Sequence, residues 1–142
     1  MYLSSNLMKL AYIESPFKGD NWEATRRNVL YARICVRDSL LRGEAPYASH
    51  LFFTQAGVLN DAVAEERALG IAAGQTLGDK FDLRAVYEDF GISRGMQYGI
   101  ERALKLGQPI EHRRISLVTD LDKALREMAE TKPHLDLGGL LF

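Results

Sequence analysis

Two short segments of the sequence bring together residue types that can hold a small ligand. The first, Glu14-Ser15-Pro16-Phe17-Lys18-Gly19, follows a short apolar run and offers a hydroxyl group, a turn and an ammonium group. Such a combination can surround an anionic group or a sugar, while the same residues also suit an ordinary turn with a capping serine. Both interpretations of this segment stay open.

The second segment, residues 89–99, is the more informative of the two. It begins with the carboxylate of Asp89, and Gly91 and Gly95 allow a ligand to approach the backbone closely. Ser93 can cap a following helix, whose free N–H groups attract anions. The spacing differs from that of a dinucleotide-binding Gly-x-Gly-x-x-Gly turn and from that of a Gly-Lys-Ser phosphate loop.

Strands and helices must bring these two segments together, and the sequence predicts both kinds of element in alternation. Strands are predicted at 8–13, 46–54, 83–87 and 110–115, and helices at 22–41, 61–78, 93–106 and 120–131. The alternation predicts an α/β fold, with an open, mostly parallel sheet and helices on both faces. Because ligands bind outside the carboxyl ends of such strands, we expect both segments to border one site.

The first long helix is expected to dock on the sheet through one apolar stripe. Trp22, Val29, Val36 and Leu40 recur at helical spacing and make up this stripe. The loop before the helix ends in two residues that suit an N-cap, and Gly43 follows the helix as a stop signal.

Length and composition limit the classes of protein to be considered. The 142 residues suit one domain, with an N-terminal extension at 1–7 and an apolar C-terminal tail at 132–142 that can dock on a neighbouring molecule. Eighteen basic residues balance nineteen acidic ones, so we expect no extended nucleic-acid surface.

The single cysteine, Cys35, excludes an internal disulfide, and we expect neither a metal nor a cofactor. We see no secretory signal and no apolar run near ~20 residues, so a cytoplasmic protein without a membrane partner is expected.

The sequence also resembles a known family. Tyr12-Ile13-Glu14-Ser15-Pro16, together with Asp89-x-Gly91 and Gly95-Met96-Gln97-Tyr98-Gly99, resembles the nucleoside 2-deoxyribosyltransferase-like superfamily over roughly residues 8–115. The stretches at 46–51 and 65–71 resemble uncharacterised phage and bacterial members of that superfamily.

The resemblance implies a small Rossmann-like fold, a homo-oligomer and a nucleoside or nucleotide ligand whose N-glycosidic bond is cleaved or exchanged. Enzymes of that superfamily use a glutamate in a Gly-x-Glu-x-Gly context as the nucleophile, and here Gln97 stands in that place. The resemblance implies that Asp89 protonates the departing base. Glu101, one helical turn beyond Gln97, and Glu88 are the displaced carboxylates that can replace the nucleophile, although Glu101 also suits a solvated helix face.

A set of further residues is expected to bind the ligand from the strand ends and the second helix. These residues are Tyr12, Ser15, Pro16, His50, Glu66, Arg67, Gly91, Ser93, Arg94, Gly95, Met96 and Gln97. His50 also suits a core or edge histidine, and Glu66 and Arg67 also suit a solvated helix face.

Three functions stay open at this point. The first is an N-glycosidase or deoxyribosyltransferase acting on a nucleoside or nucleotide. The second is a binding protein without catalysis, such as a sensor or a phage sequestering protein, which Gln97 favours because an amide bonds a ligand without attacking it. The third is a structural oligomer.

Overall fold

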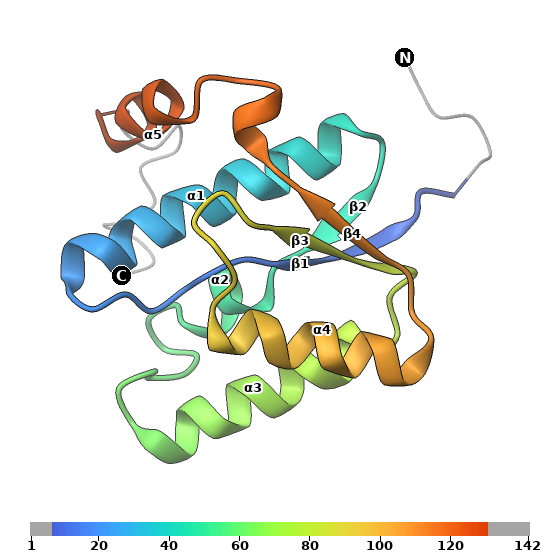
Figure 1. The fold of residues 1–142 in the computed structure, drawn as a ribbon. Helices are drawn as coiled ribbons and strands as arrows, with labels where there is room; N and C mark the ends of the chain where they lie inside the picture. The colour runs from blue at the N-terminus through green and yellow to red at the C-terminus, as the bar shows by residue number, and fades with distance from the viewer. Residues whose placement is uncertain (1–6, 131–142) are drawn as a thin grey trace.

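The computed structural model describes residues 7–130 of the chain, and it has a four-stranded parallel sheet between two layers of helices (Figure 1). The strands are β1 (Leu10–Glu14), β2 (Ala45–Tyr47), β3 (Leu83–Tyr87) and β4 (Ile110–Arg113). The helices are α1 (Trp22–Leu41), α2 (Ser49–Phe53), α3 (Ala64–Gly78), α4 (Arg94–Leu106) and α5 (Leu121–Glu130), with a short 3-10 turn, η1 (Ile115–Leu117), between β4 and α5. The α/β, Rossmann-like fold predicted from the sequence is confirmed.

The strand order is β2-β1-β3-β4, and every pair is parallel. The chain leaves β1 through α1 toward one edge of the sheet, and it later leaves β3 through α4 toward the other edge. Helices α1 and α5 cover one face, whereas α3 and α4 cover the other (Figure 1). The order therefore reverses between β1 and β3, which is where open α/β sheets leave a crevice for ligands.

Alternate residues of β1 and β3 face different layers, because successive side chains of a strand point to opposite faces. Ala11, Ile13 and Ala85 belong to the main hydrophobic core, which includes Tyr31 and Cys35 of α1. We call this side the apolar face. Tyr12, Glu14 and Arg84 occupy the intervening positions beneath α3 and α4, and these three residues define the polar face.

One predicted strand is wrong in its second half. Residues 46–54 were expected to be a single strand, but β2 pairs with β1 only as far as Tyr47, and Ser49–Phe53 form α2. Pro46 is tolerated because β2 is an edge strand. Beyond it, the hydroxyl group of Ser49 bonds that of Tyr12, so tertiary contacts override the strand preference of the aromatic residues.

The predicted docking stripe of α1 is wrong at its two ends, because Trp22 and Leu40 are exposed, whereas Val36 packs against the main core. The buried side of this helix is formed by Asn28, Leu30, Tyr31, Ala32, Ile34, Cys35 and Ser39. Because the polar residues Asn28 and Ser39 lie within this buried face, the apolar residues of α1 alone do not show its helical periodicity. Asn28 is accommodated because its amide donates to the carbonyl oxygen of Phe17.

The helix ends largely agree with the signals in the sequence. The Asn21 side chain accepts from the Ala24 N–H at 2.8 Å, Ser93 caps α4, and Gly107 ends α4 with a φ of 69°. The helix predicted from residue 61 begins three residues later, at Ala64. Residues 1–6 of the predicted extension and the predicted tail at 132–142 lie outside the described residues.

None of the helices between residues 7 and 130 has both the length and the apolar composition to cross a membrane.

Candidate functional site

A pocket of about 960 Å³ opens at the carboxyl end of β1 and beside the N-terminus of α4, on the polar face of the sheet. Residues from the loop after β1, from α2, from α3 and from the first turns of α4 surround it. Its charged and hydrogen-bonding lining comprises Tyr12, Glu14, Ser15, Lys18, Ser49, His50, Thr54, Asp61, Glu66, Arg67, Gln75, Thr76, Ser93, Arg94, Tyr98 and Arg102. Both segments singled out in the sequence thus contribute to one pocket.

The buried carboxylate of this pocket comes from the end of β1. Glu14 is only 7 % exposed, and its Oε2 accepts from Arg84 Nη1 at 2.6 Å. Burial raises the pKa of Glu14 to about 7, because the charged form loses water, although the Arg84 guanidinium acts in the opposite direction. The neutral acid is therefore favoured over the carboxylate more than it is in an exposed glutamate.

Close packing of α4 against β1 depends on a glycine above this carboxylate. A Cβ atom at Gly99 would overlap the Glu14 carboxylate and would lie 3.0 Å from Arg84 Nη1. Gly74 and Gly78 of α3 have the same role, because a Cβ there would lie 2.8 Å from the Tyr12 hydroxyl and from Arg84 Nη2, respectively. Glycines on both helices thus make room for the polar face.

Arg84 is fully buried and is held by four side chains. Besides Glu14, these are Gln75 at 3.0 Å, Asp79 at 3.0 Å and Gln108 at 2.7 Å. Asp79 also accepts from Arg102, and the pKa of Asp79 is lowered chiefly by that hydrogen bond. Because all three guanidinium nitrogens donate hydrogen bonds, the guanidinium under the pocket has a fixed position.

A serine and a histidine lie side by side in the same pocket. Ser15 Oγ is 3.0 Å from His50 Nε2, and the His50 ring packs edge-on against Phe17, with 5.8 Å between the ring centroids. Burial lowers the pKa of His50 to about 4, because the charged imidazolium loses water. His50 is therefore neutral at physiological pH and can accept the proton of the Ser15 hydroxyl.

Tyr12 joins α2 to the polar face. Its hydroxyl group bonds Ser49 Oγ at 2.5 Å, and its ring packs edge-on against Phe81. Burial raises the pKa of Tyr12 to about 12, so the phenol stays protonated. The ring is thus held at the base of the pocket.

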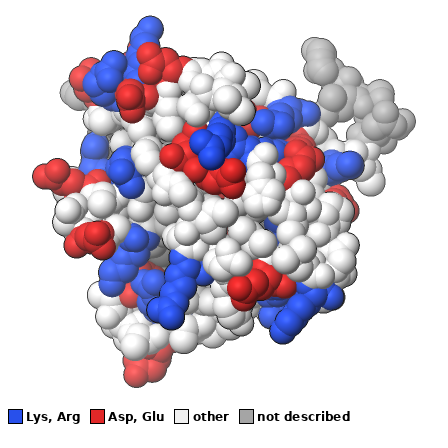
Figure 2. Space-filling view, viewed as in Figure 1, with Lys and Arg blue, Asp and Glu red and all other residues white. Residues whose placement is uncertain are grey.

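The mouth of the pocket near α4 favours anions. Ser93 Oγ accepts from the Met96 N–H, and the free N–H groups of the first turn carry partial positive charge. Lys18 and Arg94 line this part, and neither has an ion-pair partner within residues 7–130. Figure 2 shows basic side chains gathered near the N-terminal end of α4.

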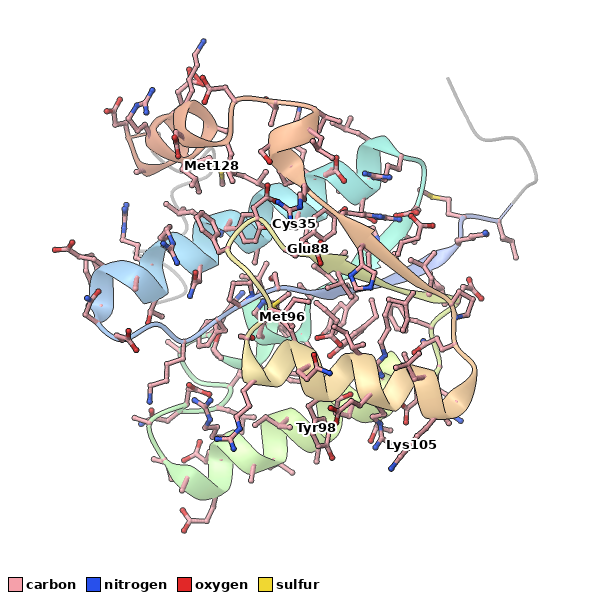
Figure 3. The ribbon with its side chains drawn as sticks, in the orientation of Figure 1. Cys35, Glu88, Met96, Tyr98, Lys105 and Met128 are labelled. Atoms are coloured by element: carbon pink, nitrogen blue, oxygen red, sulfur yellow. The ribbon has the colours of Figure 1, made fainter. Side chains whose placement is uncertain are left out.

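Most of the residues predicted to bind the ligand line this pocket. They are Tyr12, Ser15, His50, Glu66, Arg67, Ser93, Arg94, Gly95 and Met96. In Figure 3, Met96 of α4 turns toward the sheet. Pro16, Gly91 and Gln97 were predicted with them and do not line the pocket. The exposed amide of Gln97 donates to Glu101 at 3.2 Å.

The three carboxylates predicted to be catalytic are also outside the lining. Asp89 faces α1 and η1, where it accepts from the Tyr31 hydroxyl at 2.6 Å and from the N–H groups of Ile115 and Ser116. These bonds lower the pKa of Asp89, so it is a poor proton donor. Glu88 lies 3.0 Å from His112 Nδ1, and Glu101 is exposed on α4.

The role of Glu14 was not predicted from the sequence, although Glu14 is the first residue of the predicted ligand-binding segment at 14–19. A charged residue that ends an apolar strand was the available signal, because such a position is normally buried. Ser49, Asp61 and Arg102 were also missed, and their place in the lining depends on how α2, α3 and α4 pack.

Comparison with known proteins gives a family without an activity. Residues 9–113 match the family model described as "Domain of unknown function (DUF7768)". No curated protein matches the chain. The resemblance to nucleoside 2-deoxyribosyltransferase-like proteins is not tested by this match and stays a prediction.

Proposed function

The chain belongs to the DUF7768 family, and we propose that its pocket binds a nucleoside or nucleotide and cleaves the N-glycosidic bond of that ligand. One observation carries the proposal: a buried carboxyl group, Glu14, lies in a ligand-sized pocket at the carboxyl end of β1. The proposal agrees with what the resemblance of Tyr12–Pro16 to the deoxyribosyltransferase-like superfamily implies, and it moves the acid from Asp89, after β3, to Glu14 at the end of β1.

Cleavage of an N-glycosidic bond requires a carboxyl group for a physical reason. The sugar becomes cation-like as the bond breaks, and the departing base needs a proton. A carboxyl group with a pKa near the working pH can donate that proton and then stabilise the positive charge that develops on the sugar. Glu14, whose pKa is raised to about 7, suits both roles.

The rest of the pocket suits a nucleotide. A volume of about 960 Å³ lies at the upper end of the roughly 300–1,000 Å³ typical of small-molecule sites. Lys18, Arg94 and the N-terminus of α4 can take an anionic group, and Tyr12 and Phe17 offer aromatic surface to a base. The ligand class is therefore a nucleoside carrying one or more phosphates.

A panel of nucleosides, nucleoside monophosphates and ADP-ribose-like nucleotides tests the proposal. Base release is followed by chromatography, and thermal shifts are recorded on the same samples. We expect release of base by the wild-type protein, loss of at least about 100-fold in Glu14→Gln, and no change in Glu23→Gln, an exposed carboxylate on α1.

Other outcomes point to the alternatives. Loss of activity in Asp89→Asn or Glu101→Gln, with Glu14→Gln active, would return the chemistry to the carboxylates predicted from sequence. A thermal shift with the ligand recovered intact would indicate a binding protein without catalysis. No shift with any member of the panel would leave the structural oligomer.

We also propose that the chain forms a homo-oligomer. Leu69 and Ile71 of α3 and Leu104 of α4 are 60 %, 50 % and 67 % exposed, so the outer surfaces of these two helices offer apolar area to a second copy of the chain. Sedimentation analysis of the wild-type chain and of a Leu69→Lys variant tests this expectation, because a monomeric wild-type chain would contradict it.

A further inference from the structure

The Ser15–His50 pair is a second chemical group in the pocket, separate from Glu14. Ser15 is 8 % exposed, and its Oγ lies 3.0 Å from His50 Nε2. The two side chains come from different elements, the loop after β1 and helix α2, and both line the pocket. His50 is held in place by the edge-on packing of Phe17, and its carbonyl oxygen accepts from the Thr54 hydroxyl.

Glu14 is badly placed to attack a sugar itself. Its Oε2 is bound to Arg84, and α4 closes over the carboxylate at Gly99. A carboxyl group fixed on two sides can deliver a proton more readily than it can move to form a covalent bond. The attacking oxygen must then come from elsewhere in the pocket.

We propose that Ser15 and His50 activate a water molecule in this pocket, so that the glycosidic bond is hydrolysed in a single displacement. This inference rests on the proposed function, since it concerns the mechanism of the same site. The pair would act as the base, and Glu14 would act as the acid.

The water oxygen forms a bond to the anomeric carbon and gives a proton to Ser15 Oγ, while the Ser15 proton passes to His50 Nε2. The bond from the anomeric carbon to the base nitrogen breaks with its electron pair on nitrogen, and that nitrogen takes the proton of Glu14. The products are a free sugar and a free base, and solvent returns a proton from His50 to Glu14.

Burial shifts the pKa values of Glu14 and His50 in opposite directions, as the roles of acid and base require. Burial raises the pKa of Glu14 to about 7 and lowers the pKa of His50 to about 4. Burial thus favours the protonated form of Glu14 and the neutral form of His50, which is the pattern expected of an acid and a base sharing one site. The other charged groups lining the pocket are Lys18 beyond β1, Asp61 in the loop before α3, Glu66 and Arg67 at the start of α3, and Arg94 and Arg102 on α4.

Stereochemistry gives the sharpest test. A β-nucleotide substrate is cleaved in aqueous methanol, and the methyl glycoside is analysed by NMR, because a methyl glycoside keeps its anomeric configuration. We expect the α-anomer, which a single displacement produces. The β-anomer, or a sugar covalently bound to Glu14 in mass spectra of the quenched protein, would overturn the proposal.

Two variants test the pair itself. We expect Ser15→Ala and His50→Gln each to lower the rate by about 100-fold or more, while the thermal shift given by the bound nucleotide is kept. In His50→Gln the fall of kcat/KM below about pH 4 should also disappear, which a merely structural role would not cause. His112→Gln, on exposed β4, is the matched control and should match the wild type.

Failure of this inference and failure of the proposed function look different. If the wild-type protein releases no base from any nucleotide, the proposed function fails and the inference fails with it. If base is released, but both variants keep the wild-type rate and pH profile, only the Ser15–His50 pair is excluded.

Discussion

The two faces of the sheet are built from alternate residues of the same strands, yet they bury different chemistry. On the apolar face, Ala11, Ile13 and Ala85 pack against Tyr31 and Cys35 of α1 in one continuous core. On the polar face, Tyr12, Glu14 and Arg84 lie beneath α3 and α4 and form hydrogen bonds at every step. Apolar contacts dominate the first face, whereas on the second face Met96 and Ile100 of α4 pack on Val86 beside the hydrogen-bonded Glu14 and Arg84.

This difference indicates what each face contributes. Burial of apolar side chains stabilises the fold directly, whereas a buried ion pair gains little over an apolar pair of the same size. A protein that only needed stability would lose nothing by making both faces apolar. We infer that the polar face is kept for its chemistry, and that the apolar face supplies the stability that allows it.

The largest effect is expected from removing the cation of the polar face. At about pH 9, above the Glu14 pKa of about 7, Arg84→Met leaves the Glu14 charge buried without its partner, and such a loss costs about 3–5 kcal/mol. Adding Glu14→Gln to this variant removes the unpaired charge and should restore part of the loss. Urea unfolding of the two variants measures the difference, and a double variant as unstable as Arg84→Met would contradict the account.

A methyl group at Gly99 should disrupt the packing of α4 on the polar face by steric overlap. Gly99→Ala places a Cβ against the Glu14 carboxylate, and we expect a loss of about 1–3 kcal/mol together with loss of base release. Gly95→Ala on the same helix is the control for stability, because a Cβ atom added there would have no heavy atom within 4 Å, and it should be neutral or stabilising by up to about 1 kcal/mol. Equal stability of the two variants would show that α4 does not press on Glu14.

The dependence of stability on pH should separate Glu14 from the apolar core. Because the folded-state pKa of Glu14 is raised from 4.5 to about 7, its contribution is fully present below pH 4.5 and is lost as the pH rises through 7. The Tm of the wild type relative to Glu14→Gln should therefore fall between pH 4.5 and pH 7. A Tm difference that rises over this interval would mean that Arg84 outweighs burial.

The smallest effect is expected on the apolar face. Ile34→Val removes one buried methylene group from α1 and should cost about 0.5–1.5 kcal/mol, while base release stays at the wild-type rate. Thermal unfolding and the base-release assay are run on the same preparation. A change in base release would mean that the two faces are coupled.

A structural feature of this molecule could be predicted from the sequence when the residues that cause it are close together in the chain. The alternation of strands and helices, the Ser93 cap and the Gly107 stop are local, and the structure confirms them. Residues 46–54 were misread because α2 is held by a contact with Tyr12, far away in the chain. The roles of Glu14 and Arg84 were missed because they depend on the close approach of α3 and α4, which no local pattern encodes.

The protonation of Glu14 is the most direct test of the account, because the proposed chemistry depends on it and the measurement needs no ligand. The ¹³C shift of the Glu14 carboxyl group, assigned by its absence in Glu14→Gln, is followed by NMR as the pH is varied. We expect a midpoint near pH 7. A midpoint at or below the ordinary value of 4.5 would contradict the account, since Glu14 would then be a permanently charged partner of Arg84 and could not serve as the acid.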